Sequence, residues 1–164
     1  MTYVIQNGLA GFQPIAVTDT TKNHPLGYIV TAVDPTYGEG EFIYLKGIAD
    51  TAVGSLVDYD QTLATTALAP ATGGIGPVAV AMSANVVDQF GWYQIGGAAA
   101  VKAPNSASVG AEVFMLAATA GSVDDAQVNA EQILNAKFST TTGTPSTGLA
   151  IIQIDRPFHQ GQTV

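Results

Sequence analysis

Residues 27–47 read GYIVTAVDPTYGEGEFIYLKG and contain the first clear β pattern of the chain. Two runs rich in β-branched and aromatic residues, at 27–33 and 42–47, flank a segment that begins with Asp34-Pro35. Such residues favour strands, while Pro and Gly favour the turns that join them. The stretch therefore predicts a β-hairpin that turns across Gly38 and Gly40.

Runs of the same kind recur along the chain, separated by short segments rich in Gly, Pro, Ala and Thr. The further predicted strands are residues 56–60, 78–82, 89–96, 111–116 and 149–155, with a turn at 67–76, a loose segment at 98–105, and Pro157 ending the last strand. About eight to ten short strands without a long helical period predict an all-β domain. We expect an antiparallel β-sandwich or a β-barrel-like domain.

Residues 122–139, SVDDAQVNAEQILNAKFS, fit two secondary structures. Ser122 followed by two aspartates resembles a helix N-cap. Leu134, Ala136 and Phe138 alternate with polar residues, as in a strand. We favour a turn followed by a strand, and helix or strand stays open for 122–133.

A weak internal similarity links residues 52–59, AVGSLVDY, with residues 108–115, SVGAEVFM. Each segment has a small residue, Val-Gly, two further residues and then Val. The pair indicates either two copies of one strand-loop-strand unit or a chance match, because Gly and Val are abundant in this chain.

The domain organisation follows from length and from the two ends. A chain of 164 residues is long enough to bury one ordinary core. Residues 1–26 contain Pro14, Pro25 and an Asn7-Gly8 turn signal, so we expect an extended N-terminal arm. Residues 27–158 form a single β domain in this reading, and residues 159–164 form a flexible C-terminal tail.

Composition and charge exclude several functional classes. The net charge is −8, which would repel a polyphosphate, so we expect no direct nucleic-acid binding. The chain lacks a secretory signal pattern and a long apolar run, so we expect no membrane insertion. No cysteine is present, which removes disulfides and thiolate chemistry. Only 11% of residues are charged, and so sparse a charged surface predicts a homo-oligomer.

The acidic residues do not form a recognisable site in the sequence. Asp58 and Asp60 share one face of a predicted strand, and Glu39 and Glu41 flank the hairpin turn. Ca²⁺ requires about six to eight oxygen ligands, more than either pair supplies. We therefore expect solvated carboxylates rather than a metal site. Asp58 with Glu112 is a conceivable glycosidase pair, but strand carboxylates generally face solvent.

Other side chains and motifs also favour structural roles. His24 and His159 lie near the two ends without a nucleophile motif, so we expect exposed residues rather than catalytic ones. Gly73–Gly76 predicts a turn rather than a phosphate-binding loop, and no cofactor is implied. Trp92 and Tyr93 could form an aromatic platform for a sugar or a partner, although a core position is favoured.

Three blocks together carry a resemblance to a known family: HPLGYIVTAVDPTYGEGEFIYLKGIADTAVGSLVDYD, GPVAVAMSANVVDQFGWYQIGGAAAVKA, and GAEVFMLAATAGSVDD with the following ILNAKF. In their order, over about residues 24–158, they resemble the capsid cement or decoration proteins of tailed bacteriophages. The resemblance lies in the whole-chain pattern and brings no catalytic residue.

The resemblance implies a structural virion protein without enzymatic activity. Its partner would be the major capsid protein, bound on the outer surface of the phage head at junctions between subunits. The interface residues expected from the arm and from the aromatic strand are Val4, Ile5, Leu9, Phe12, His24, Trp92 and Tyr93. The alternative is a carbohydrate-binding or adhesin-like β module, and a hydrolase built on scattered carboxylates is the weakest option.

Overall fold

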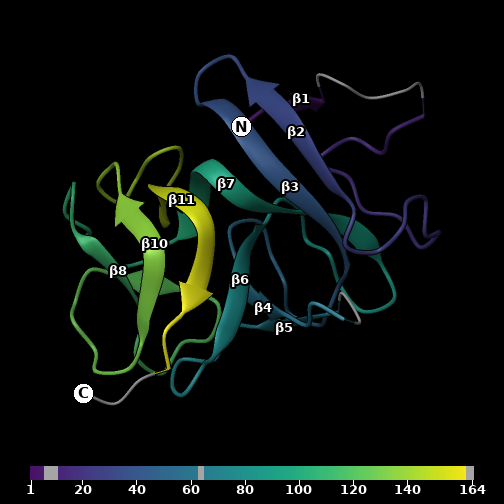
Figure 1. Ribbon diagram of the computed structural model, residues 1–164. Helices are drawn as coiled ribbons and strands as arrows, with labels where there is room; N and C mark the ends of the chain where they lie inside the picture. The colour runs from purple at the N-terminus through teal and green to yellow at the C-terminus, as the bar shows by residue number, and fades with distance from the viewer. Residues whose placement is uncertain (6–10, 63–64, 162–164) are drawn as a thin grey trace.

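The computed structural model describes residues 1–5, 11–62 and 65–161, and these residues form an all-β domain without a helix (Figure 1). The strands are β1 (Val4–Ile5), β2 (Ile29–Asp34), β3 (Gly38–Lys46), β4 (Leu56–Tyr59), β5 (Thr66–Leu68), β6 (Gly76–Ala81), β7 (Phe90–Lys102), β8 (Glu112–Met115), β9 (Val123–Asp124), β10 (Gln132–Phe138) and β11 (Leu149–His159). Neighbouring strands pair antiparallel in the order β1-β2-β3-β7-β6-β11-β10-β8-β9, and β4 joins β5 to β6. The predicted fold class is confirmed.

The hairpin predicted from residues 27–47 is present as β2 and β3, but the predicted turn across Gly38 and Gly40 is wrong. The turn lies at residues 35–37, and Gly38 and Gly40 pair with Asp34 and Ala32 as part of β3. The register of the hairpin runs from Ile29 opposite Ile43 to Asp34 opposite Gly38. The Asp34 carboxylate accepts hydrogen bonds from the amides of Thr36 (2.8 Å) and Tyr37 (3.1 Å). The turn is therefore held by its own first side chain, as expected of an Asp at this position.

Strand β7 crosses the middle of the sheet and changes partners along its length. Its first half pairs with β3, and its second half pairs with β11. The change falls at Gly97, where φ is +89° and an added Cβ would lie 2.4 Å from the Glu39 carbonyl oxygen. Only glycine fits this bend.

Two predicted strand limits in this region are wrong. Residues 98–102 are not loose but continue β7, because their backbone pairs with β11. Alanine has a low preference for strands, so these residues carry no strand signal. Pro157 does not end β11, which continues to His159. The register with β10 shifts between Leu134 and Ala136, opposite the proline, and an irregularity of this kind accommodates a residue without an amide hydrogen.

The similarity between residues 52–59 and 108–115 reflects two copies of one structural unit. Strands β4 and β8 begin and end 56 positions apart, at Leu56 and Glu112 and at Tyr59 and Met115. Each follows a turn with a left-handed glycine, Gly54 at φ +82° and Gly110 at φ +83°.

Backbone hydrogen bonds confirm the repetition. The Gly54 amide donates to Ala81 at 2.8 Å, and the Gly110 amide donates to Phe138 at 2.7 Å. Strand pairing repeats as well: β4 pairs with β5 and β6 as β8 pairs with β9 and β10. The chain thus contains a first repeat, β3 to β6, and a second repeat, β7 to β10, and β11 follows the second as β7 follows the first.

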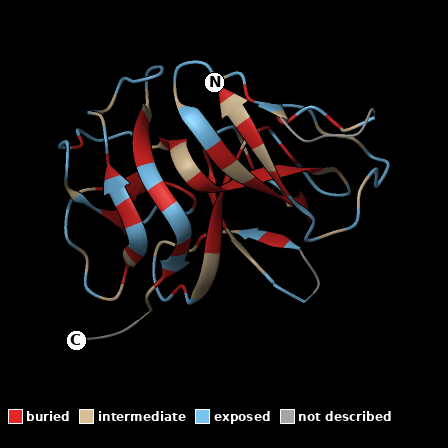
Figure 2. Ribbon diagram, turned by 45° about the horizontal axis from the view of Figure 1, so that its top comes forward, coloured by how far each residue is buried: buried red, intermediate tan, exposed pale blue. Residues whose placement is uncertain are grey.

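Three apolar layers separate these elements, and Figure 2 shows buried residues along most strands. Phe42, Tyr44 and Trp92 face the N-terminal segment, while the alternate residues of β3 and β7 face β4 and β6. The remaining side chains of β4 and β6 enter the largest layer, with β8 to β11. This is the two-residue alternation expected of strands that are buried on both faces.

The described part of the N-terminal segment packs against the domain. Val4 pairs with Val33 through β1, and Tyr3 and Ile15 are buried against β2, β3 and β7. The segment therefore covers one face of the central sheet. Residues 15–26 contain no described strand and include turns, one of them closed by the Val17 amide donating to the Pro14 carbonyl at 3.1 Å.

Candidate interaction surfaces

A stack of three rings lies where the N-terminal segment meets β2, and we name Phe12, His24 and Tyr28 the aromatic edge. Phe12 stacks on His24 with ring centroids 4.9 Å apart and on Tyr28 at 6.1 Å. Tyr28 is 43% exposed, and Ile29 beside it is also exposed. The aromatic edge is thus partly buried at Phe12 and His24 and exposed to solvent at Tyr28.

His24 connects this edge to the core. Its ring touches the rings of Tyr44 (5.1 Å) and Trp92 (5.4 Å). Its Nε2 atom accepts a hydrogen bond from the Gln13 amide at 3.1 Å, which requires the neutral imidazole. Burial lowers the pKa of His24, in agreement with this acceptor role.

Gln13 is a hydrogen-bonding centre that the sequence analysis missed. Its side-chain nitrogen donates to the carbonyls of Val17 (2.6 Å) and Phe90 (3.0 Å). Its side-chain oxygen accepts from the Tyr44 hydroxyl (2.9 Å) and from Asn23 (3.1 Å). Its backbone carbonyl accepts from the Trp92 indole at 2.9 Å. A lone Gln before a proline gives no sequence signal of this role.

The structure divides the predicted interface residues into two groups. Val4 is exposed, and Ile5, Phe12 and His24 are partly buried at the surface of the N-terminal segment, while Leu9 lies outside the described residues. Trp92 and Tyr93 are fully buried. Their assignment to an interface is therefore wrong for the folded chain, and the favoured core position is confirmed. The aromatic platform on which a sugar-binding reading depended is not on the surface.

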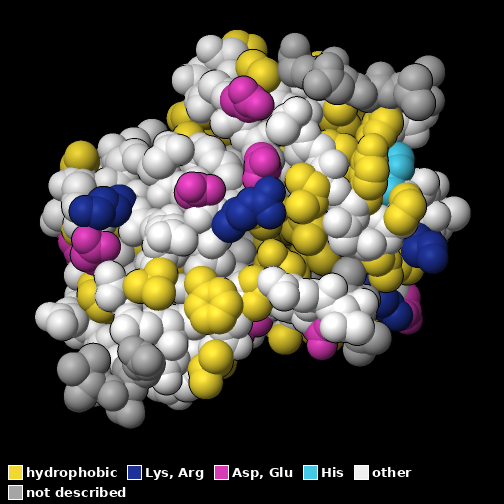
Figure 3. All heavy atoms as spheres, in the orientation of Figure 1, with side chains coloured by type: hydrophobic (Ala, Val, Ile, Leu, Met, Phe, Trp, Pro, Cys, Tyr) yellow, Lys and Arg dark blue, Asp and Glu magenta, His cyan; other side chains and the backbone are white. Residues whose placement is uncertain are grey.

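A second exposed apolar group is formed by Ile75, Leu134 and Phe158, which we name the β10–β11 patch. Phe158 lies directly opposite Leu134 in the β10–β11 ladder and opposite Pro77 in the ladder with β6. Ile75 immediately precedes β6 and is 71% exposed, while Phe158 is 40% exposed. Figure 3 shows hydrophobic side chains gathered over the lower ends of these strands, with few charges among them.

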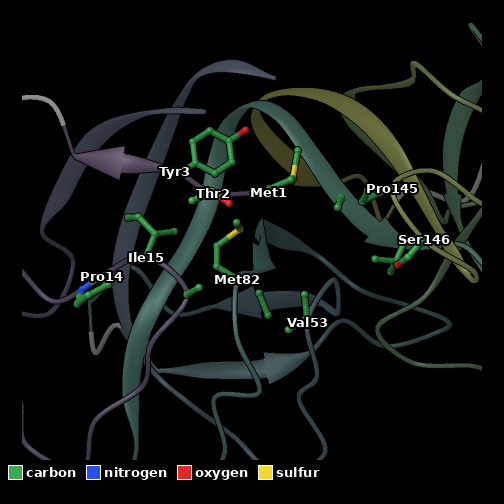
Figure 4. Close-up of a pocket in the computed structure, with 13 residues that line it drawn as sticks. Met1, Thr2, Tyr3, Pro14, Ile15, Val53, Met82, Pro145 and Ser146 are labelled. Atoms are coloured by element: carbon green, nitrogen blue, oxygen red, sulfur yellow. The ribbon is translucent and has the colours of Figure 1, made fainter. Parts of the chain in front are cut away.

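An apolar cavity of about 510 Å³ separates the first residues from the 145–149 loop (Figure 4). Met1, Ile15, Val53 and Met82 line it from four different segments. The Tyr3 hydroxyl at its wall already donates to the Ala98 carbonyl at 2.8 Å. The lining is mainly apolar, with Thr2 and Ser146 as its other hydroxyl side chains, and we assign no chemistry to it.

Three ionisable side chains meet in the interior at the end of β11, and we name His159, Glu131 and Asp58 the buried triad. The His159 Nε2 atom lies 2.9 Å from Glu131 Oε2, and its Nδ1 atom lies 3.9 Å from Asp58 Oδ1. Glu131 also accepts a hydrogen bond from the Gly73 amide at 2.7 Å.

The buried triad corrects two predictions. His159 was expected in an exposed tail, but it is completely buried in β11. Asp58 was expected on a solvated face; its side chain is 23% exposed, but its Oδ1 atom is buried and faces the imidazole. Burial by itself lowers the pKa of His159, but the hydrogen bond with Glu131 and the negative charges of Asp58 and Glu131 outweigh burial and raise it. Sequence separation hid this contact, since the three residues come from distant segments.

The other candidate carboxylates remain at the surface. Glu41 pairs with Arg156 at 3.1 Å, and Glu112 pairs with Lys137 at 3.1 Å, so Glu112 and Asp58 have different partners. Within 1–5, 11–62 and 65–161, no three His, Asp or Glu side chains are grouped so as to hold a metal ion. The same residues include no helix long and apolar enough to cross a membrane.

Comparisons with known proteins identify no relative of this chain: no family model, no curated protein and no solved structure matches it.

Proposed function

We propose that this chain is a structural protein of a tailed-phage virion, which binds the outer surface of the head at junctions between major capsid subunits and stabilises the shell. The resemblance of residues 24–158 to capsid cement proteins suggests the class. The observation that carries the proposal is the pair of exposed apolar surfaces on one β domain, the aromatic edge and the β10–β11 patch.

The positions of these surfaces suit a protein that bridges neighbours. The aromatic edge adjoins β2, near one end of the strand order, and the β10–β11 patch lies towards the other end. Exposed apolar groups of this kind typically mark protein interaction sites. A chain that contacts two subunits at once gains avidity, because the second contact forms at a high effective concentration. Repetition by capsid symmetry multiplies the gain, and no catalytic step is required.

The sparse surface charge also supports association between copies of the chain. Three ion pairs, Lys46–Asp88, Lys137–Glu112 and Arg156–Glu41, occupy three of the five cationic side chains. We therefore include a homo-oligomer in the proposal. Sedimentation velocity over a wide concentration range measures it, and a monomer at every concentration would remove this part.

The direct test adds purified chain to expanded heads that were assembled without it. We expect saturable decoration in cryo-EM images and a higher temperature of shell disruption. Tyr28→Asp and Phe158→Asp place a charge in the aromatic edge and in the β10–β11 patch, and each should weaken binding at least about tenfold, because a buried unpaired charge costs more than 1.4 kcal/mol.

Val109→Asp is the matched control. Val109 is 65% exposed in the turn before β8, outside both surfaces, and its substitution adds the same charge. Binding by this variant should equal that of the wild-type chain. The proposal fails if the wild-type chain does not bind, and the assignment of the two surfaces fails if all three variants bind equally.

A further inference from the structure

We propose that the buried triad is a pH-sensitive latch: protonated His159 joins the first repeat, the second repeat and the end of β11, and loss of its proton loosens that joint. The proposal concerns the isolated chain and does not depend on the capsid role.

The positions of the three residues make this site a joint. Asp58 belongs to β4 of the first repeat, and Glu131 immediately precedes β10 of the second repeat. His159 ends β11 and pairs with Ile133 on one side and Gly76 on the other. The three side chains are therefore the polar contact at which both repeats and the C-terminal strand meet.

The geometry favours a proton on each ring nitrogen. Glu131 Oε2 at 2.9 Å accepts from Nε2. The remaining pair, His159 Nδ1 and Asp58 Oδ1, is buried, 3.9 Å apart, and has no other hydrogen-bond partner. When Nδ1 carries a proton, this pair is an attraction between opposite charges. When it does not, two buried acceptors face each other and neither is satisfied.

The negative charges around His159 also favour its protonated form. Asp58 from β4 and Glu131 from the segment before β10 are the groups whose charges act on the ring. The segment before β6 contributes Gly73 and Gly74, which are not ionisable, and β6 and β10 contribute Gly76 and Ile133. With both carboxyl groups ionised, the protonated site carries a net charge of −1, and deprotonation leaves two negative charges without a positive partner, that of the buried Glu131 and that of the partly buried Asp58.

The glycine beside the ring shows how little room the site has to relax. An added Cβ at Gly74 would lie 1.9 Å from His159 Nδ1. The ring therefore cannot turn towards the segment before β6. When His159 is neutral, we infer that the segments around it separate. Because Ile75 and Phe158 lie on two of these segments, their positions in the β10–β11 patch would then depend on the protonation of His159.

The sign of the pH dependence follows from linkage. A histidine whose pKa is raised above 6.5 in the folded state binds its proton more tightly there than in the unfolded chain. Its stabilising contribution is complete below pH 6.5 and is lost as the pH rises through the folded-state pKa. This opposes His24, whose lowered pKa makes stability fall on acidification.

The test titrates both imidazoles of the intact chain by NMR. His24→Gln assigns the signals, because these are the only two histidines. We expect the His159 midpoint above 6.5, and each unit above that value corresponds to about tenfold tighter proton binding in the folded state. Glu131→Gln should lower the midpoint. A His159 midpoint at or below 6.5 in the wild-type chain overturns the proposal, and this measurement does not need any triad variant to fold.

The latch itself is read from amide hydrogen exchange. After correction for the intrinsic pH dependence, the amides of Gly73 and Gln160, which donate to Glu131 and to the Gln132 carbonyl, should lose protection above the His159 midpoint. The Gly110 amide, which donates to Phe138 away from the triad, should not. His159→Gln should abolish the pH dependence at Gly73 and Gln160. Unchanged protection across the midpoint in the wild-type chain would contradict a latch even if His159 titrates as expected.

Discussion

Replacement of Gln13 by leucine tests whether the N-terminal segment is an integral part of the domain. Gln13→Leu keeps a side chain of similar size and removes the four hydrogen bonds that the Gln13 side chain makes, to Val17, Phe90, Tyr44 and Asn23. The backbone bonds from Gln13 to His24 and from Trp92 to Gln13 do not depend on the side chain. The variant therefore isolates one polar centre.

The expected cost follows from those four bonds. A neutral hydrogen bond contributes about 1 kcal/mol net, and Val17 and Asn23 are exposed, so water replaces Gln13 there. The Phe90 carbonyl and the Tyr44 hydroxyl keep one other donor each, from the amides of Asp19 and Asn23. We expect a loss of about 2–3 kcal/mol in the free energy of unfolding, and a melting temperature lower by roughly 4–12 °C.

Urea denaturation followed by Trp92 fluorescence is the assay, because the chain has one tryptophan and its indole contacts Gln13. Gln127→Leu is the control: Gln127 is exposed in the loop before β10, and its substitution should change stability by less than about 0.5 kcal/mol. If Gln13→Leu is no more destabilising than Gln127→Leu, the segment is not anchored as described, and the reasoning is refuted.

Three further predictions test the bend, the surface histidine and the core. Gly97→Ala should destabilise the chain by at least about 2 kcal/mol more than Gly110→Ala, because both glycines have positive φ but only at Gly97 does the new Cβ meet backbone atoms. Equal losses of unfolding free energy in chemical denaturation would contradict this account. Because burial lowers the pKa of His24, the wild-type chain should lose more stability than His24→Gln as the pH falls below about 6.5. The measurement is the unfolding free energy of both chains from about pH 7 to 5, and parallel curves would refute the prediction. Burial raises the pKa of Tyr93 to about 12, so stability should fall above about pH 10, where the tyrosine of the unfolded chain ionises. Tyr93→Phe should show a smaller fall of unfolding free energy in an alkaline pH series. An equal fall in both chains would count against burial of the phenol.

The buried triad and the aromatic edge place the two histidines of the chain under opposite constraints. His24 accepts a hydrogen bond through Nε2 and is therefore favoured as the neutral ring. His159 lies between two carboxyl groups and is favoured as the charged ring. The two histidines therefore act in opposite directions on stability: the contribution of His24 is lost on acidification, and that of His159 is lost as the pH rises.

Much of the local structure could be predicted from the sequence. β-branched and aromatic runs punctuated by Gly and Pro were sufficient for the β2–β3 hairpin, for β4, β6 and β8, and for a strand rather than a helix at Leu134 to Phe138, because these signals depend on near neighbours. The similarity between residues 52–59 and 108–115 was also visible, but a chance match stayed open until the structure showed matching glycine turns and strand pairings.

Features that depend on a distant partner could not be predicted from the sequence. Residues 98–102 are a strand only because β11 lies beside them, and Pro157 is tolerated only because the ladder with β10 is irregular there. Asp58, Glu131 and His159 look like unrelated polar residues until the fold brings them into one buried site. The physical reason is that propensity and periodicity act over a few residues, whereas pairing, burial and charge compensation depend on contacts between segments that lie far apart in the chain.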